Sequence, residues 1–103
     1  MLVRSRIDII TQILEVVNDG SGDGGDDGVT KTKIMYKAFL TYVQLKEYLP
    51  ALTDNGLLRY DVDAQTFKTT QKGLRFLNTY NQIYDAIKIP PQQQVKMQEG
   101  GGL

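Results

Sequence analysis

The sequence predicts one mainly α-helical domain with a small β-hairpin, in the order helix, helix, helix, hairpin, helix. Three segments carry apolar residues at helical spacing, and a fourth, shorter segment begins with a threonine suited to capping a helix. A further segment alternates apolar and polar residues on either side of a turn. The length of 103 residues suits a single domain with one hydrophobic core.

The composition excludes several kinds of chemistry. The chain has no Cys and no His, so thiol and imidazole nucleophiles, bases and metal ligands are absent. Lys+Arg and Asp+Glu number 12 each, and this balance argues against a protein that coats nucleic acid by bulk charge. No apolar run approaches the roughly 18–20 residues of a membrane span. We therefore expect a soluble, cytoplasmic domain without membrane association, enzymatic activity or cofactor.

The first helix is expected from about Ser5 to Asn18. Its apolar positions recur at helical spacing, at Ile7, Ile10, Ile13 or Leu14, and Val17. Ser5 and Asp8 stand at the spacing of a capping box, with Asp in place of the preferred Glu. The segment 19–28, DGSGDGGDDG, has four Asp and no apolar residue, which predicts a flexible, solvated loop.

The same acidic loop resembles the opening of a calcium-binding loop. Asp19, Ser21 and Asp23 stand at the spacing of the first ligands. Thr30, however, occupies the twelfth position, where such a loop requires a bidentate Glu. A weak divalent-ion site is therefore the less favoured alternative, and we expect no metal.

Two helices joined by a tight turn are expected between Thr30 and Gly56. Thr30 can cap a short helix that ends near Ala38, and Thr41 can cap a second helix, with Gln44 at the capping-box position. Gly56 is typical of a helix end. The residues expected on the inner face of the second helix are Tyr42, Leu45, Leu49 and Leu52. Two short helices with such a connection indicate a helix-turn-helix.

Pro50 lies inside the second of these helices. A proline there lacks the N–H that would bond the carbonyl of Lys46, so it predicts a kink or a loosened last turn. The first turn of the helix, where recognition of a ligand is expected, precedes the proline and is spared.

The hairpin and a last helix follow. Leu58, Tyr60 and Val62 alternate with polar residues, and segment 63–65 turns the chain into a return strand that ends at Thr69. The last helix is expected over 71–89, before two prolines. A coiled-coil-like seam is formed by Leu77, Tyr80, Tyr84 and Ile87, at 3-4-3 spacing. The tail, 90–103, has the composition of a disordered end.

Three helices followed by a hairpin form a winged helix-turn-helix domain, here 1–70, with a C-terminal coiled-coil-like helix added. The phrases KTKIMYKA, LTYVQLKEYL and TTQKGLRFL resemble those of small archaeal winged-helix DNA-binding proteins. That group includes the ArnR-like regulators and ten-kilodalton chromatin-type proteins that dimerise through a C-terminal helix. The resemblance covers about 7–77 apart from the acidic loop. It implies a winged helix, a homodimer through the last helix and double-stranded DNA as the ligand.

Candidate DNA contacts lie mainly in segment 29–46, which contains four lysines and no acidic residue. Lysines neutralise phosphates, and the start of the second helix of a helix-turn-helix enters the major groove. Gln44 can bond an adenine edge and Val43 can contact a thymine methyl group. The full candidate set is Lys31, Lys33, Lys37, Thr41, Val43, Gln44, Lys46 and, from the hairpin, Lys68. The alternative is that these lysines only solvate the outside of helices.

The last helix carries more apolar residues than one small core can cover. Tyr80, Ile83, Tyr84 and Ile87 are the candidate dimerisation residues, because left exposed they form a patch that monomers rarely tolerate. The predicted function is a dimeric transcription regulator that inserts the helix 41–53 into the major groove. The alternative is a winged-helix module that binds another protein and no nucleic acid.

Overall fold

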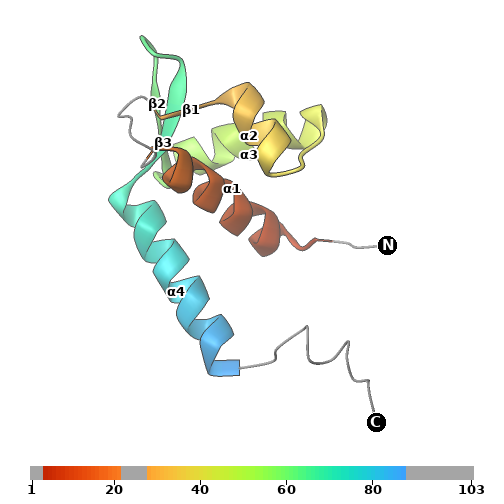
Figure 1. Cartoon of the computed structure of the whole chain (residues 1–103), viewed down its shortest axis with the longest axis vertical. Coiled ribbons are helices and arrows are strands. Elements are labelled where there is room, and N and C mark those ends of the chain that lie inside the picture. Colours follow the sequence, from red (N-terminus) through yellow and green to blue (C-terminus); the bar gives the residue numbers. More distant parts are fainter. Residues whose placement is uncertain (1–3, 22–27, 88–103) are drawn as a thin grey trace.

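The computed structural model describes residues 4–21 and 28–87, and this part of the chain folds into four helices and one small sheet (Figure 1). The helices are α1 (Arg6–Ser21), α2 (Lys31–Lys37), α3 (Tyr42–Asp54) and α4 (Gln71–Ile87). The strands are β1 (Val29–Thr30), β2 (Leu58–Asp61) and β3 (Thr66–Thr69), which pair antiparallel in the order β1-β3-β2. The predicted fold class, a mainly α-helical winged helix-turn-helix with an added C-terminal helix, is confirmed.

The capping box at the start of α1 is formed as predicted. The Ser5 backbone N–H donates to Asp8 Oδ2 at 3.2 Å, and the Asp8 N–H donates to Ser5 Oγ at 3.1 Å. The bond from the Ser5 backbone holds the pKa of the Asp8 carboxyl below its usual value. The predicted end at Asn18 is wrong, since α1 continues to Ser21. Gly20 permits this, because a Cβ there would overlap Val29, which packs against it from β1.

The sheet contains one strand more than the predicted hairpin. Leu58 pairs with Thr69 and Asp61 with Thr66, so β2 and β3 form the hairpin, and Gln65 turns the chain with a φ of 57°. On the other edge of β3, Val29 pairs with Phe67. This added strand, β1, is only two residues long and links α1 to α2.

The core lies between α1, α2, α3 and the sheet. Its fully buried side chains are Ile13, Leu14, Val17, Val29, Ile34 and Leu58. Leu45, Leu49 and Leu52 of α3 are also buried, as predicted, but Tyr42 is 61% exposed. The core position goes instead to Tyr48, one turn before Leu52 on the same side of the helix. Ile7 was likewise expected on the inner face and is 46% exposed.

Pro50 lies on an exposed side of α3, and the helix continues through it to Asp54. The last turn keeps its hydrogen bonds: the Asn55 backbone N–H donates to the Ala51 carbonyl at 3.0 Å, and the Thr53 hydroxyl donates to the Leu49 carbonyl at 2.8 Å. The expected loosening of this turn is therefore not present. Pro50 itself has no N–H to donate to the Lys46 carbonyl, and the bond of Asn55 to Ala51 lies beyond that missing bond.

The last helix, α4, extends away from the rest of the domain (Figure 1). Its first half contacts the body of the protein, where Leu77 is buried and Phe76 packs against the core. The predicted acidic loop lies mostly outside the described residues. The tail, 90–103, and the predicted last two residues of the helix, 88–89, lie wholly outside the described residues.

Candidate nucleic-acid interface

Both helices of the predicted helix-turn-helix begin at their predicted threonine caps. Thr30 Oγ1 accepts a hydrogen bond from the Lys33 N–H at 3.2 Å at the start of α2. At the start of α3, Thr41 Oγ1 accepts from the Gln44 N–H at 3.1 Å, and Gln44 Oε1 accepts from the Thr41 N–H at 3.0 Å. This reciprocal pair satisfies two N–H groups that a helix start leaves unbonded. The capping box therefore stabilises the start of α3.

The turn between the two helices has an unusual backbone. Phe39 adopts a φ of 55°, in the left-handed region that a bulky residue rarely occupies, and its side chain is 76% exposed. The next residue, Leu40, turns inward and is buried. The turn between the two helices thus has one inward and one outward apolar side chain.

Arg4, near the N-terminus, holds this turn through hydrogen bonds of its side chain. Its guanidinium donates to the carbonyls of Ala38 at 2.8 Å and Phe39 at 2.7 Å, and to Gln12 Oε1 at 2.7 Å. A planar guanidinium can serve several acceptors at once, whereas an ammonium acts from a single point. Sequence reasoning missed this residue, because no local pattern links position 4 to positions 38 and 39.

The Arg4 contacts predict a large effect from a single change. Arg4→Met keeps much of the side-chain volume but leaves two turn carbonyls without this donor, so we expect a loss of about 2 kcal/mol in the free energy of unfolding. Urea denaturation followed by circular dichroism measures it. Arg6→Met is the matched control, since within the described residues Arg6 makes one exposed ion pair, with Glu47 at 3.7 Å. Equal effects of the two changes would contradict the assigned role.

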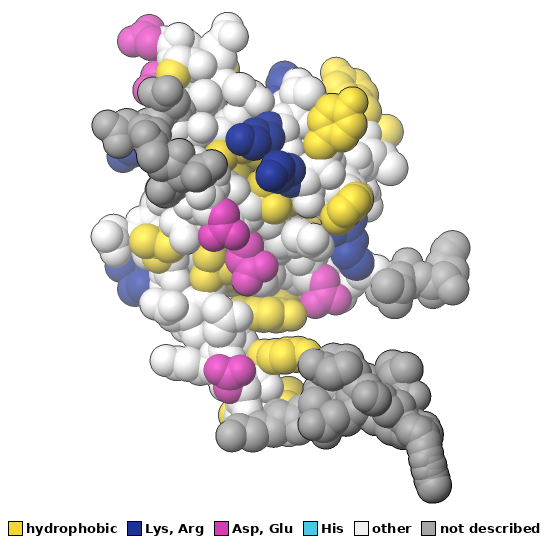
Figure 2. All heavy atoms as spheres, in the orientation of Figure 1, with side chains coloured by type: hydrophobic (Ala, Val, Ile, Leu, Met, Phe, Trp, Pro, Cys, Tyr) yellow, Lys and Arg dark blue, Asp and Glu magenta, His cyan; other side chains and the backbone are white. Residues whose placement is uncertain are grey.

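The lysines of α2 and α3 are at the surface. Lys31, Lys33, Lys37 and Lys46 are all exposed, and none of them forms an ion pair with a described carboxylate. In Figure 2, basic side chains lie over the region of α2, and acidic side chains lie over α1. The neutral chain therefore carries its charges unevenly. Segment 29–46 offers positive charge without a carboxylate of its own.

The first turn of α3 exposes apolar rather than polar side chains. Val43 is 72% exposed and Tyr42 is 61% exposed. The Lys46 ammonium lies over the Tyr42 ring, 5.3 Å from its centroid. Gln44 is only half-exposed, and its amide oxygen is used by the capping box. An amide oxygen has two lone pairs, so the predicted bidentate contact of Gln44 with adenine would share that oxygen with the cap.

The hairpin offers a poorer surface to DNA. Lys68 is half-buried and pairs across the strands with the exposed Arg59. The tip beyond them carries Asp61 and Asp63, and the Asp61 carboxylate accepts hydrogen bonds from the N–H groups of Asp63 and Ala64. The acidic tip is therefore part of the turn, and the basic pair stands behind it.

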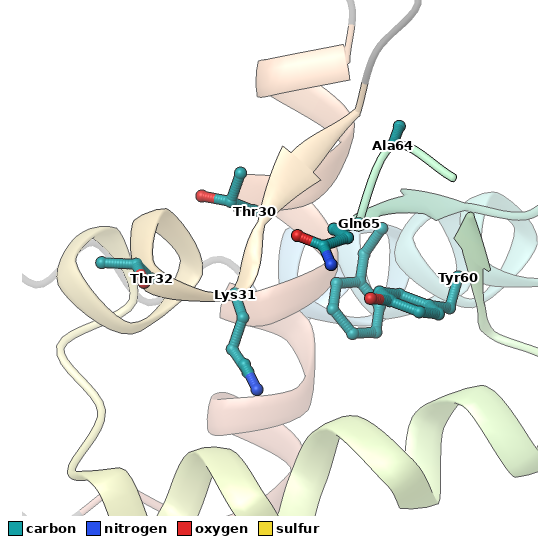
Figure 3. A pocket seen from close by; sticks show the side chains of 7 residues that line it. Thr30, Lys31, Thr32, Tyr60, Ala64 and Gln65 are labelled. Atoms are coloured by element: carbon teal, nitrogen blue, oxygen red, sulfur yellow. The ribbon is translucent and has the colours of Figure 1, made fainter. Parts of the chain in front are cut away.

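A hollow separates the hairpin from the start of α2 (Figure 3). It has a volume of about 530 Å³ and is lined by Thr30, Lys31, Thr32, Tyr60, Ala64, Gln65 and Phe67. The Tyr60 and Phe67 rings form one wall, with centroids 4.7 Å apart. Lys31 lies across from the Tyr60 ring, as Figure 3 shows. Lys31, a candidate phosphate contact, therefore lies between the helix-turn-helix and the hairpin.

Comparison with known proteins agrees with this architecture. A family model described as a winged helix-turn-helix matches residues 3–88, which include all four helices and the whole sheet. The chain belongs to the winged helix-turn-helix family. Members of this family are typically DNA-binding domains without enzymatic activity. The match extends through α4, so the added C-terminal helix lies within the region that the family model describes.

One relative is an uncharacterised protein of Methanocaldococcus jannaschii, an archaeon. It is 24% identical to this chain over 88 residues, which cover 85% of this chain and 81% of the relative. Because that protein is uncharacterised, it supports the archaeal likeness of the winged helix-turn-helix and assigns no role to single residues.

The second half of α4 exposes the predicted dimerisation residues. Ile83, Tyr84 and Ile87 are 58%, 49% and 57% exposed. Tyr80 is half-buried, and its hydroxyl donates to Asp8 Oδ1 at 3.2 Å. Burial raises the pKa of Tyr80, and the hydrogen bond to Asp8 raises it further. Tyr80 thus joins α4 to α1, while the other three residues form an apolar stripe beyond that contact.

The described part of the chain contains no group of three or more acidic, His or Cys residues placed to hold a metal ion. The candidate calcium loop falls largely in 22–27, outside the described residues. No helix within the described ranges combines the length and apolar character needed to cross a membrane.

Proposed function

We propose that this protein binds duplex DNA as a dimeric transcription regulator, with the first turn of α3 in the major groove. The observation that carries the proposal is the combination of a rigidly capped α3 with exposed lysines and no carboxylate in segment 29–46. In a helix-turn-helix, the first helix crosses the phosphate backbone and the second enters the groove. Membership of the winged helix-turn-helix family supports the same ligand.

The contacts divide into two kinds. Lys31, Lys33 and Lys37 of α2 bind phosphates and supply most of the affinity. Val43 and Lys46 of α3 reach base edges, and Thr41 and Gln44 hold the helix start in place. Lys68 adds a weaker phosphate contact from the hairpin, because it is half-buried behind an acidic tip.

Binding of labelled duplexes, measured by fluorescence anisotropy over a salt series, tests the proposal. We expect micromolar or tighter binding at low salt, with affinity that falls steeply as salt rises because counterions are released. A folded protein that binds no duplex at low salt would contradict the proposal. That result would favour the alternative, a winged-helix module that binds another protein.

The dimer is proposed to form through the apolar stripe of α4. Ile83, Tyr84 and Ile87 are exposed on a helix that extends beyond the domain, and two such stripes can cover each other. The narrower resemblance to archaeal regulators with a C-terminal dimerisation helix supports this arrangement. Such a dimer presents two copies of α3 to half-sites about one DNA turn, or a multiple of it, apart.

Ile83→Lys is expected to make the protein monomeric without unfolding it. The change places a charge at the centre of the stripe, and Ile83 is exposed in the single chain, so the domain core is untouched. Light scattering coupled to size exclusion gives the mass, and circular dichroism checks the fold. Gln82→Lys adds the same charge to an exposed position of the same helix and should leave the dimer intact. A parent protein that is monomeric at concentrations of tens of micromolar would contradict the proposed dimer.

A further inference from the structure

The polar side chains at the start of α3 are engaged with each other. Thr41 Oγ1 and Gln44 Oε1 each accept a backbone N–H of the other residue, at 3.1 and 3.0 Å. Opening either bond would leave an N–H at the helix start without its partner, which costs free energy. Thr41 and Gln44, two of the polar residues predicted to contact DNA, are thus also used to hold the helix start.

Two large side chains of the first turn of α3 are exposed and present mainly hydrocarbon surface. Val43 is 72% exposed and Tyr42 is 61% exposed, in the turn of α3 that a helix-turn-helix presents to the groove. Phe39, two residues before the Thr41 cap, is 76% exposed. We call Phe39, Tyr42 and Val43 the turn surface.

The backbone conformation of Phe39 is unfavourable, in addition to the exposure of its ring. Its φ of 55° is strained for a residue with a side chain, and a glycine would relieve both the strain and the exposed ring. Arg4 holds the strained backbone by bonding the carbonyls of Ala38 and Phe39. A ring kept exposed in this way, beside the start of α3, indicates that it has a contact to make.

The charges around the turn surface indicate which kind of ligand it would contact. Lys33 and Lys37 of α2 and Lys46 of α3 are exposed nearby in the chain, and segment 29–46 contains no carboxylate. The first acidic residue beyond it, Glu47, pairs with Arg6. This combination suits a polyanion that also presents apolar groups. The major groove of DNA is such a surface, because each thymine places a methyl group there.

We propose that the turn surface reads thymine methyl groups in the major groove, with Val43 as its central contact. Specificity for A·T pairs then comes from apolar contacts, and the lysines of α2 bind phosphates without regard to sequence. This inference rests on the proposed DNA binding and adds the class of base feature that is recognised.

Replacing thymine by deoxyuridine tests the inference, because it removes the methyl group and leaves the base pairing and the phosphates. Two A·T-rich duplexes of one sequence, one with thymine and one with deoxyuridine, are compared by fluorescence anisotropy. We expect the deoxyuridine duplex to bind about three- to fivefold more weakly for each methyl group buried. The dependence on salt should be the same for both, because the phosphate contacts are unchanged. Melting curves verify that both are double-stranded at the assay temperature.

Two variants assign the effect to the turn surface. Val43→Ala should reduce the ratio of the affinity for the thymine duplex to the affinity for the deoxyuridine duplex. Val62→Ala, the matched control, removes the same methyl groups from a valine that is 74% exposed at the hairpin tip, and it should leave the ratio unchanged. Equal binding of both duplexes by the parent protein would overturn the inference while leaving DNA binding in place. Absence of binding to either duplex would instead overturn the proposed function. A ratio that Val43→Ala does not alter would remove Val43 from the reading surface.

Discussion

The double change Lys31→Ala/Lys33→Ala is expected to weaken duplex-DNA binding on the order of tenfold at low salt. Both side chains are exposed on the first turn of α2, and neither pairs with a described carboxylate, so their charges are available to phosphates. The slope of log affinity against log salt should become less negative by about 0.9 for each phosphate contact removed. The fold should be preserved, because no core contact of either side chain is lost.

Arg75→Ala is the matched control for this pair. It also removes positive charge from an exposed helical position, but on α4, away from the helix-turn-helix. The control should leave the salt slope unchanged. If both variants weaken binding equally, the affinity comes from general charge and not from α2. If neither does, the phosphate contacts lie elsewhere.

Gly73→Ala is expected to destabilise the protein, although alanine is the better helix former. Gly73 is buried in the first turn of α4, and a Cβ there would overlap the Leu57 carbonyl oxygen and lie 2.7 Å from Thr69 Cγ2. The Leu57 carbonyl cannot easily move, since it accepts hydrogen bonds from the backbone N–H and the hydroxyl of Thr70, both at 3.1 Å. Overpacking of this kind costs about 1–3 kcal/mol, against a gain of at most about 1 kcal/mol from helix propensity.

Thermal unfolding followed by circular dichroism measures the change in stability caused by Gly73→Ala. A net loss of about 1 kcal/mol lowers Tm by roughly 4–8 °C in a domain of this size. Asn78→Ala, at an exposed position of the same helix, should change the stability by no more than about 0.5 kcal/mol. A Gly73→Ala protein as stable as the parent would mean that α4 can shift away from Leu57 at no cost.

Local features of this protein could be predicted because they depend on residues a few positions apart. The capping boxes of Ser5 with Asp8 and of Thr41 with Gln44 are both formed. The cap at Thr30 and the turn before Thr66 are also where the sequence placed them. The candidate DNA contacts were found from charge pattern, and their positions on the surface agree with that use, but their role stays a prediction.

Features that depend on distant residues could not be predicted. Tyr42 and Tyr48 are both aromatic residues of one helix, and which of them is buried depends on how α3 is rotated against the sheet. Strand β1 has two residues, too few for a pattern of its own, and it forms because β3 offers a free edge. The Arg4 contacts join residues 34 and 35 positions apart.

The sequence alone determined the order of the four helices and the hairpin, the helix caps and the basic character of segment 29–46, because hydrophobic periodicity, capping and charge act over a few residues. Only the tertiary structure decided that Arg4 bonds the turn before α3, that Phe39 is held outward in a strained turn, and that Tyr80 bonds Asp8 while Ile83 stays exposed. These outcomes depend on where the packed elements place each side chain, and that placement is set by burying the core as a whole.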